Sequence, residues 1–527
     1  MPPTLPPPHP SFSEACRFWL KLGLISFGGP AGQIAIMHRE LVERRRWISE
    51  RRFLHALNFC MVLPGPEAQQ LATYLGWLLH KTPGALVAGS LFFLPAMLML
   101  IVLGWLYLSF GDLSAVTALL YGVKPAVTAI VWFAAYRIGS RILQNRWLAA
   151  LAAAAFGAIF LLRAPFPLIL IGAALIGAVG SKLAPQVFAV GGGRGKPRAD
   201  FGPALIDDAT PIPTHALFSW PRLVKLSAVG GLLWAGALGL LWLLFGWNGA
   251  LTQMGWFFTK AALLTFGGAY AVLPYVYQGA VEEFRWLSAQ QMMDALALGE
   301  TTPGPLIMVN TFVGFVAGWG QALFGPERLF AAGALAATVV TYFTFLPSFL
   351  FILAGGPLIE TSHGNVGFTA PLTAVTAAVV GVIVDLAVFF AYHVGWPNGW
   401  DGPIDGFAVS LSAASLLALG RYRLGVIPVI VAAALLGAGW RCLGAESGLS
   451  SSLSAKRLAA SNKPGPHGPI SKPASRQRIT ARKVAPIGRR ASSTLVFPIA
   501  GYARVSCQRA WLVKTGGKRL TPKNIRN

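Results

Sequence analysis

Apolar runs separated by short polar loops account for most of the chain. Runs such as 84–108 and 223–246 are long enough to cross a hydrocarbon core of about 30 Å as helices. The alternation of apolar and polar positions expected of membrane-spanning strands is absent. The pattern therefore predicts an all-α polytopic membrane protein with about 10 to 13 membrane elements. The expected elements are 18–37, 53–79, 84–108, 115–136, 147–162, 165–180, 223–246, 257–278, 292–319, 330–354, 372–391, 407–419 and 424–440.

The composition agrees with a membrane protein. The chain is 55% hydrophobic and 12% charged, with a mean hydropathy of +0.59, which is too apolar for a soluble globular protein of 527 residues. The start, 1–10, is rich in proline and has no basic region ahead of an apolar stretch, so we expect no cleaved signal peptide. Its four cysteines are scattered, and no Walker loop, zinc spacing or nucleophile elbow is present. We therefore expect no cofactor, no metal and no enzyme activity.

The net charge of +24 is concentrated at one end of the chain. Residues 443–527 hold seventeen Lys and Arg against one acid, Glu446, and contain no apolar run, so we expect a disordered tail. The other basic residues lie in short loops, as the positive-inside rule predicts for an inner-membrane protein. The charge therefore argues for a lipid bilayer as partner and against nucleic acid.

The second half of the chain repeats the first. Phe266-Gly267-Gly268 follows Phe27-Gly28-Gly29 by 239 positions, and Pro303-Gly304-Pro305 follows Pro64-Gly65-Pro66 by the same distance. A constant offset between separated landmarks indicates an internal duplication. The predicted domains are an N-terminal repeat (1–182), a linker (183–222), an extra helix with the C-terminal repeat (223–442) and the basic tail (443–527).

The helix at 223–246 predicts how the repeats are oriented. It has no counterpart in the first half, and one extra crossing between two sets of six elements inverts the second set. The basic loop at 39–52 fits the cytoplasmic face, whereas the acidic loops near 282 and 401 fit the outer face. The same count places the basic tail outside, so we expect one of the short late elements not to cross.

Two apolar elements in each repeat are interrupted by glycine and proline, which disfavour a continuous helix. If the element 53–79 simply crossed, the basic loop at 39–52 would lie opposite the basic loop at 137–146, against the positive-inside rule. We therefore predict that 53–79 is re-entrant: it enters, turns at Pro64-Gly65-Pro66 and leaves on the same side.

Broken helices at membrane depth are candidate anion sites, because the free N–H groups at a helix N-terminus can hold an oxyanion. Corresponding interruptions in two repeats also point to a transporter's binding site. Glycine and proline can instead serve a kink or close packing, but recurrence at constant spacing favours a site. The predicted substrate-binding residues are Gly28, Gly29, Pro30, Gln33, Pro64, Gly65, Pro66, Gly267, Gly268, Pro303, Gly304 and Pro305.

Glu67 and Glu300 flank the second interruption of each repeat and are predicted to couple transport to protons, because a buried ionisable group in a membrane usually serves ion passage. Each can alternatively cap a half-helix. The two acids do not occupy equivalent positions, so a coupling role would be asymmetric. Arg137 is expected either to pair with Asp385 across the repeats or to reach the interface.

These residues carry a family likeness. The runs 27–33, 38–47 and 63–70 resemble the signatures of the chromate ion transporters in their long, two-domain form, and the likeness spans about residues 12 to 442. It implies a multi-pass protein of the bacterial inner membrane that exports chromate, uses the membrane potential or a proton gradient, and confers chromate resistance. The second repeat has Ala269 where the first has Pro30, and the tail is not part of the family pattern.

Three alternatives stay open at this stage: a carrier for sulfate or another oxyanion, an anion channel, and a membrane enzyme. Chromate and sulfate share shape and charge, so backbone donors do not readily separate them. A homodimer is also left open. Our mechanistic hypothesis is alternating access, in which the two repeats rock about a central site at the interrupted helices.

Overall fold

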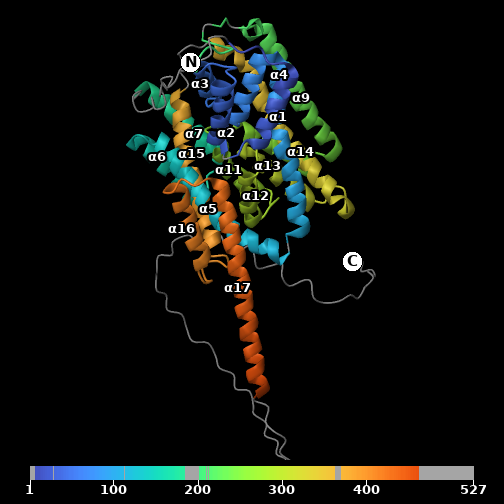
Figure 1. Ribbon diagram of the computed structural model, residues 1–527, viewed down its shortest axis with the longest axis vertical. Coiled ribbons are helices and arrows are strands. Elements are labelled where there is room, and N and C mark those ends of the chain that lie inside the picture. Colours follow the sequence, from blue (N-terminus) through green and yellow to red (C-terminus); the bar gives the residue numbers. More distant parts are fainter. Residues whose placement is uncertain are drawn as a thin grey trace, which may run out of the picture. The chain divides into compact units, whose positions relative to one another are not determined.

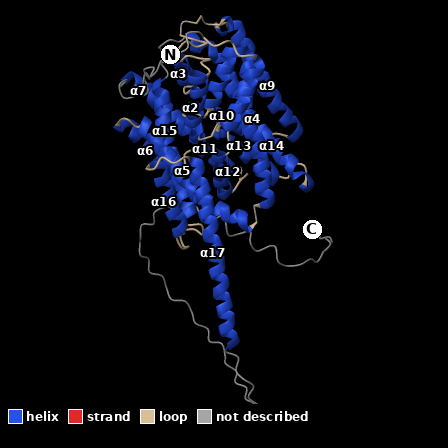
Figure 2. Ribbon diagram, viewed as in Figure 1, coloured by secondary structure: helices blue, strands red, loops and turns tan. Residues whose placement is uncertain are grey.

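The computed structural model describes residues 6–27, 29–111, 113–183, 201–208, 210–211, 213–361 and 369–461. Within these residues the chain is helical, with one isolated bridge between Ile48 and Ile206, and Figure 2 shows helices joined by loops. In the described part of the chain, seven helices are long and apolar enough to cross a membrane, and three shorter apolar helices accompany them. The prediction of an all-α polytopic membrane protein is confirmed.

The first repeat comprises α1 (Phe12–Ile25), α2 (Gly29–His38), the π-helical turn η1 (Arg39–Arg44), α3 (Glu50–Cys60), α4 (Glu67–Phe110), α5 (Ser114–Ile142), α6 (Arg146–Leu162) and α7 (Phe166–Leu183). The short η2 (Thr214–Ala216) and the unpaired α9 (Trp220–Phe245) follow. The second repeat comprises α10 (Ala250–Leu263), α11 (Ala269–Tyr277), η3 (Gln278–Glu283), α12 (Ala289–Thr301), η4 (Leu306–Met308), α13 (Val309–Gly320), η5 (Pro326–Arg328), α14 (Leu329–Thr361), α15 (Thr369–Gly395), α16 (Gly406–Gly420) and α17 (Val426–Ser461). Most of the predicted tail, 462–527, lies outside the described residues.

The duplication extends to backbone detail. The π-helical turn at 39–44 recurs at 278–283, again displaced by 239 positions. The left-handed residue after it, Arg46 (φ 50°), recurs as Arg285 (φ 53°). Ser49 and Ser288 each cap the following helix by accepting a backbone N–H three residues on. The two repeats therefore share their local structure residue by residue.

Corresponding helices of the two repeats pack antiparallel. In α4 and α14, the ring of Phe93 stacks on that of Phe345 with centroids 4.2 Å apart, while Trp77 lies against Gly356, so numbering rises in one helix as it falls in the other. The start of α15 likewise packs against Ile142 at the end of α5. Antiparallel packing of equivalent helices means that the second repeat is inverted relative to the first, as predicted.

Both interrupted elements of the first repeat are re-entrant hairpins. The hairpin α1–α2 begins at Pro10, whose carbonyl lies 3.1 Å from His80 Nε2, and ends at His38, whose ring contacts Phe201. The hairpin of α3 and the first part of α4 has the same base. The Ser49 N–H at its start donates to the Ile206 carbonyl (3.0 Å), and the Trp77 carbonyl near its end lies 3.0 Å from His215 Nε2.

Both hairpins therefore enter and leave on the face that carries the basic loop 39–52 and the segment 201–216, here called the basic face. The re-entrant prediction for 53–79 agrees with this geometry, and the interruption in 18–37 is re-entrant as well. A backbone kink at His80 and Lys81 then redirects α4 across the molecule.

The late elements form a pair. Tyr121 at the start of α5 donates to the Asp405 carboxylate just before α16 (2.7 Å), and the Arg441 guanidinium of α17 lies over the same ring at 4.6 Å. The start of α16 and Arg441 of α17 therefore both lie beside Tyr121 of α5. The expectation that one of them stops short stays a prediction, and α16, with 15 residues, is one of the apolar helices in the described part of the chain that are shorter than the seven candidate spans.

Residues 1–397 and 403–447 form one compact unit, and within it the helices fall into two groups by their mutual contacts, here called bodies (Figure 1). The hairpin body comprises α1–α4 and α10–α14, packed around the α4–α14 pair. The bundle body comprises α5–α7 and α15–α17, in which α6 and α7 of the first repeat pack on α15 of the second and α16 packs on α5. The bodies meet chiefly where α11 contacts α15 and α12 contacts α5.

Candidate functional site

Each hairpin ends in a tip where the helix is interrupted. The tips are 26–29 and 61–66 in the first repeat and 264–268 and 302–305 in the second. At equivalent places the backbone takes positive φ: 69° at Gly29 and 96° at Gly268, 129° at Gly65 and 106° at Gly304. Residues with a Cβ rarely adopt these angles, which explains glycine at these positions. The predicted Gly28 lies outside the described residues.

The four tips meet in two equivalent pairs. The Gly65 N–H donates to the Thr265 carbonyl (2.7 Å), and the Gly304 N–H donates to the Ser26 carbonyl (2.8 Å). Thr265 stands 239 positions after Ser26, as Gly304 does after Gly65, so the two bonds are related by the pseudo-two-fold axis. We call the two pairs the Gly65 half-site and the Gly304 half-site. Each combines one tip from each repeat.

The Gly65 half-site is polar. A Cβ on Gly65 would lie 2.5 Å from Ser348 Oγ and 2.6 Å from Gln70 Nε2, and that amide donates to the Pro64 carbonyl (2.7 Å). Pro66 is the N-cap of α4, and Glu67 lies in its first turn. Glu67 Oε1 would lie 3.7 Å from a Cβ on Gly268, the N-cap of α11. One carboxylate and two helix N-termini therefore converge at this half-site.

The Gly304 half-site has no acid at the position equivalent to Glu67. Gln33, which is fully buried, donates a hydrogen bond to the Gly304 carbonyl, and the Cβ of Ala96 packs against Gly304. Leu306 stands where the other half-site has Glu67. The asymmetry expected from the sequence is thus built into the two tip pairs.

The remaining predicted binding residues lie at the same tips. Pro30 begins the first turn of α2, and Pro305 is the N-cap of η4. Pro303 precedes Gly304 and is buried. Gly267 (φ 78°) lies against Thr376 of α15, so the bundle body touches this tip.

Glu300 is buried in the last turn of α12 and accepts a hydrogen bond from the Tyr270 hydroxyl of α11. The charge of Arg137 in α5 acts on Glu300. The alternative pairing of Arg137 with Asp385 is not formed, because no ion pair joins these two described residues. The packing of α5 against α12 sets the position of Arg137. The constant offset between the repeats in the sequence gives no sign of this contact.

Of the sixteen buried side-chain polar atoms without a hydrogen-bond partner in the described part of the chain, eight lie at the tips or on the helices packed behind them. They are Ser26 Oγ, Gln33 Oε1, Gln69 Oε1, Gln70 Oε1, both amide atoms of Asn310, Thr344 Oγ1 and Ser348 Oγ. Buried polar atoms are normally paired, so such a concentration indicates a place where water or a polar ligand completes the bonding.

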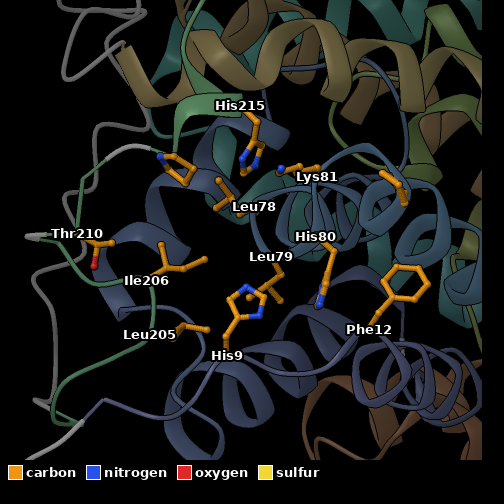
Figure 3. Close-up of a pocket in the computed structure, with 12 residues that line it drawn as sticks. His9, Phe12, Leu78, Leu79, His80, Lys81, Leu205, Ile206, Thr210 and His215 are labelled. Carbon is orange, nitrogen blue, oxygen red and sulfur yellow. The ribbon is translucent and has the colours of Figure 1, made fainter.

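A separate cavity of about 560 Å³ lies at the base of the first repeat. Figure 3 shows His9, His80 and His215 around it, with Lys81 beside His215. Burial lowers the pKa of His215, outweighing its hydrogen bond to the Trp77 carbonyl. None of the predicted site residues lines this cavity. It lies where the segment 201–216 packs against the kink of α4.

Equivalent positions of the two repeats differ in burial. Asn58 is exposed, whereas its counterpart Ala297 is 3% exposed, and Met61 is 50% exposed against 5% for Glu300. The second-repeat hairpins are covered because α15 packs on α11 and α5 on α12. There Asp294 accepts from the Tyr107 hydroxyl (2.8 Å) and lies 4.0 Å from Lys124 Nζ. The first-repeat hairpins have no such extensive cover among the described residues.

Comparison with known proteins identifies relatives of the chain. A family model described as "Chromate transporter" matches residues 13–178 and 252–438. A "Probable chromate transport protein" of Synechococcus elongatus is 30% identical over 374 residues, covering 70% of this chain and 82% of the relative. A "Chromate transport protein" of Cupriavidus metallidurans is 31% identical, covering 67% and 76%. One of Pseudomonas aeruginosa is 34% identical, covering 66% and 73%. No solved structure matches the chain.

Proposed function

Since the chain belongs to the chromate transporter family, we propose that this multi-pass membrane protein exports chromate across the bacterial inner membrane as a secondary transporter and thereby confers chromate resistance. The observation that carries the proposal is the pair of crossing bonds, Gly65 to Thr265 and Gly304 to Ser26. They bring four interrupted helices together at the interface of two inverted repeats, which is where secondary transporters bind their substrates.

The chemistry of the tips suits a tetrahedral oxyanion. Helix N-termini offer N–H groups and partial positive charge without a full cation, so a dianion can bind and still leave. The N-termini of α4 and α11 converge at the Gly65 half-site. The same donors suit sulfate, which is therefore the alternative substrate. A homodimer remains a prediction.

The difference in burial between the repeats supports alternating access. The bundle body rests on the hairpins of the second repeat and leaves those of the first repeat exposed. We infer that this state is open toward the basic face, which the positive-inside rule assigns to the cytoplasm. Rocking of the bundle body onto α2 and α3 would then close that face and expose the opposite one.

Two driving forces fit the proposal. A membrane potential negative inside favours exit of a dianion by about 4.6 kcal/mol per 100 mV, enough for a concentration ratio above about 1,000. Proton coupling would use Glu67 or Glu300. An ionised Glu67 repels a dianion at the Gly65 half-site, so protonation of Glu67 is expected to favour substrate binding. A proton carried out with the anion would move against the proton gradient, so with this coupling the membrane potential supplies the drive, whereas drive by the proton gradient requires exchange of the anion for a proton.

The test is chromate uptake into everted membrane vesicles, in which export appears as uptake. Valinomycin with potassium collapses the potential and nigericin collapses the proton gradient, so each ionophore removes one driving force. Saturable uptake that one of them abolishes supports the proposal, and competition by sulfate places both anions in one site. Uptake that does not saturate would indicate a channel, and robust sulfate movement without chromate uptake would indicate a sulfate carrier.

A further inference from the structure

A second register links α4 and α14. Phe93-Leu94-Pro95 recurs as Phe345-Leu346-Pro347, displaced by 252 positions, and the residue that follows is Ala96 in one helix and Ser348 in the other. The structure shows that the two segments occupy equivalent places. Gly304 packs against Ala96, and Gly65 packs against Ser348, so the two positions are equivalent in space as well as in sequence. The pseudo-symmetry therefore places a methyl group in one half-site and a hydroxyl in the other.

The Ser348 hydroxyl has no hydrogen-bond partner among the described residues, although the side chain is only 1% exposed. A hydroxyl in a membrane helix usually donates to the carbonyl four residues earlier. Two other hydroxyls of α14 do so: Thr338 donates to Ala334 (2.8 Å) and Thr341 to Ala337 (2.7 Å). Ser348 does not, which leaves a buried donor free beside the tip.

We propose that Ser348 binds the substrate: its hydroxyl donates a hydrogen bond to the oxyanion held at the Gly65 half-site, together with the N-terminus of α4. The inference rests on the proposed function and deepens it by assigning the anion to one half-site of the two. The Gly304 half-site has Ala96 and Leu306 at the corresponding places, so α4 presents no hydroxyl there, and the unpaired hydroxyl of that half-site is that of Ser26 on the other tip. Thr344, one helical turn earlier, also has an unpaired hydroxyl and faces the same side of α14.

The first variant is Ser348→Ala, and the matched control is Thr338→Ala. Both remove one hydroxyl from α14, but the Thr338 hydroxyl is already bonded within the helix and its side chain is exposed. Because the Ser348 hydroxyl is unpaired in the ligand-free protein, its removal leaves no partner unsatisfied and is expected not to lower the Tm of the purified protein.

In everted vesicles, Ser348→Ala is expected to raise the KM for chromate roughly 10- to 100-fold, the effect of one hydrogen bond to a charged group. Thr338→Ala should keep the wild-type KM. Stabilisation of the purified protein by chromate, and separately by sulfate, is measured as the shift in Tm. Ser348→Ala should need a correspondingly higher anion concentration for the same shift, and Ser348→Thr should restore part of the affinity.

An unchanged KM and an unchanged anion-induced Tm shift in Ser348→Ala, with a wild-type protein that transports chromate, would overturn the assignment of Ser348 and leave the proposed function standing. A wild-type protein that neither transports chromate nor is stabilised by it would overturn the proposed function itself. A lower ligand-free Tm for Ser348→Ala would show that the hydroxyl has a structural partner, which also contradicts the proposal.

Discussion

Replacing Gly65 with alanine tests whether the tips form the transport site. The backbone at Gly65 has φ 129°, which costs a residue with a Cβ about 1–3 kcal/mol. The added methyl would also lie 2.5 Å from Ser348 Oγ and 2.6 Å from Gln70 Nε2, and overpacking of this kind costs about 1–3 kcal/mol more. The tip is expected to relieve this strain by moving away from α14, which lengthens the bond from the Gly65 N–H to Thr265.

The assay is chromate uptake by everted vesicles, normalised to the amount of folded protein that elutes as a single peak in detergent. A tip displaced by about 1 Å is expected to lower uptake by about 100-fold, as misplacement of a binding group does in enzymes. Gly304→Ala, where the methyl would lie 2.7 Å from the Cβ of Ala96, should have a similar effect.

The matched control is Gly157→Ala in α6. No atom lies within 4 Å of a Cβ at Gly157, and alanine is favoured over glycine inside a helix by about 1 kcal/mol. This variant should keep wild-type uptake and unfold at the same or a higher temperature. Wild-type uptake by both Gly65→Ala and Gly304→Ala in well-expressed protein would refute the role of the tips.

Three further predictions follow from the asymmetry of the repeats. The first concerns pH and uses sulfate, because sulfate stays dianionic over the range tested. In wild-type vesicles its uptake should rise as the pH falls, because protonation of Glu67 removes a repelling charge. Glu67→Gln should flatten this profile, and a retained slope would exclude Glu67 as the coupling group. In protein freed of its four cysteines, Asn58→Cys should react with an impermeant maleimide in everted vesicles and Ala297→Cys should not; equal labelling would contradict a state open to the cytoplasm. Tyr270→Phe should lower the Tm through the loss of about 1–3 kcal/mol, because the buried Glu300 carboxylate loses its donor; an unchanged Tm would show that this hydrogen bond is dispensable.

Several features of the site were accessible from the sequence because they depend on local chemistry. Glycine at 65 and 304 is needed for positive φ, and proline next to it interrupts the helix, so the tips could be located without a structure. Ser348 could have been found from the Phe-Leu-Pro echo between α4 and α14. The shift of register from 239 to 252 positions concealed it, because the second repeat has an insertion between α13 and α14.

The sequence alone determined the class, the duplication and the places of the interruptions, because apolar length and backbone preferences act over a few residues. Only the tertiary structure decided which tips meet. Gly65 bonds to Thr265, 200 positions away, because the antiparallel packing of α4 on α14 brings the repeats together about a pseudo-two-fold axis. The same packing sets Ser348 beside Gly65 and leaves Asn58 exposed while Ala297 is buried. These contacts and burials depend on the packing of helices that are distant in the sequence, and the conformational preferences of single residues do not determine them.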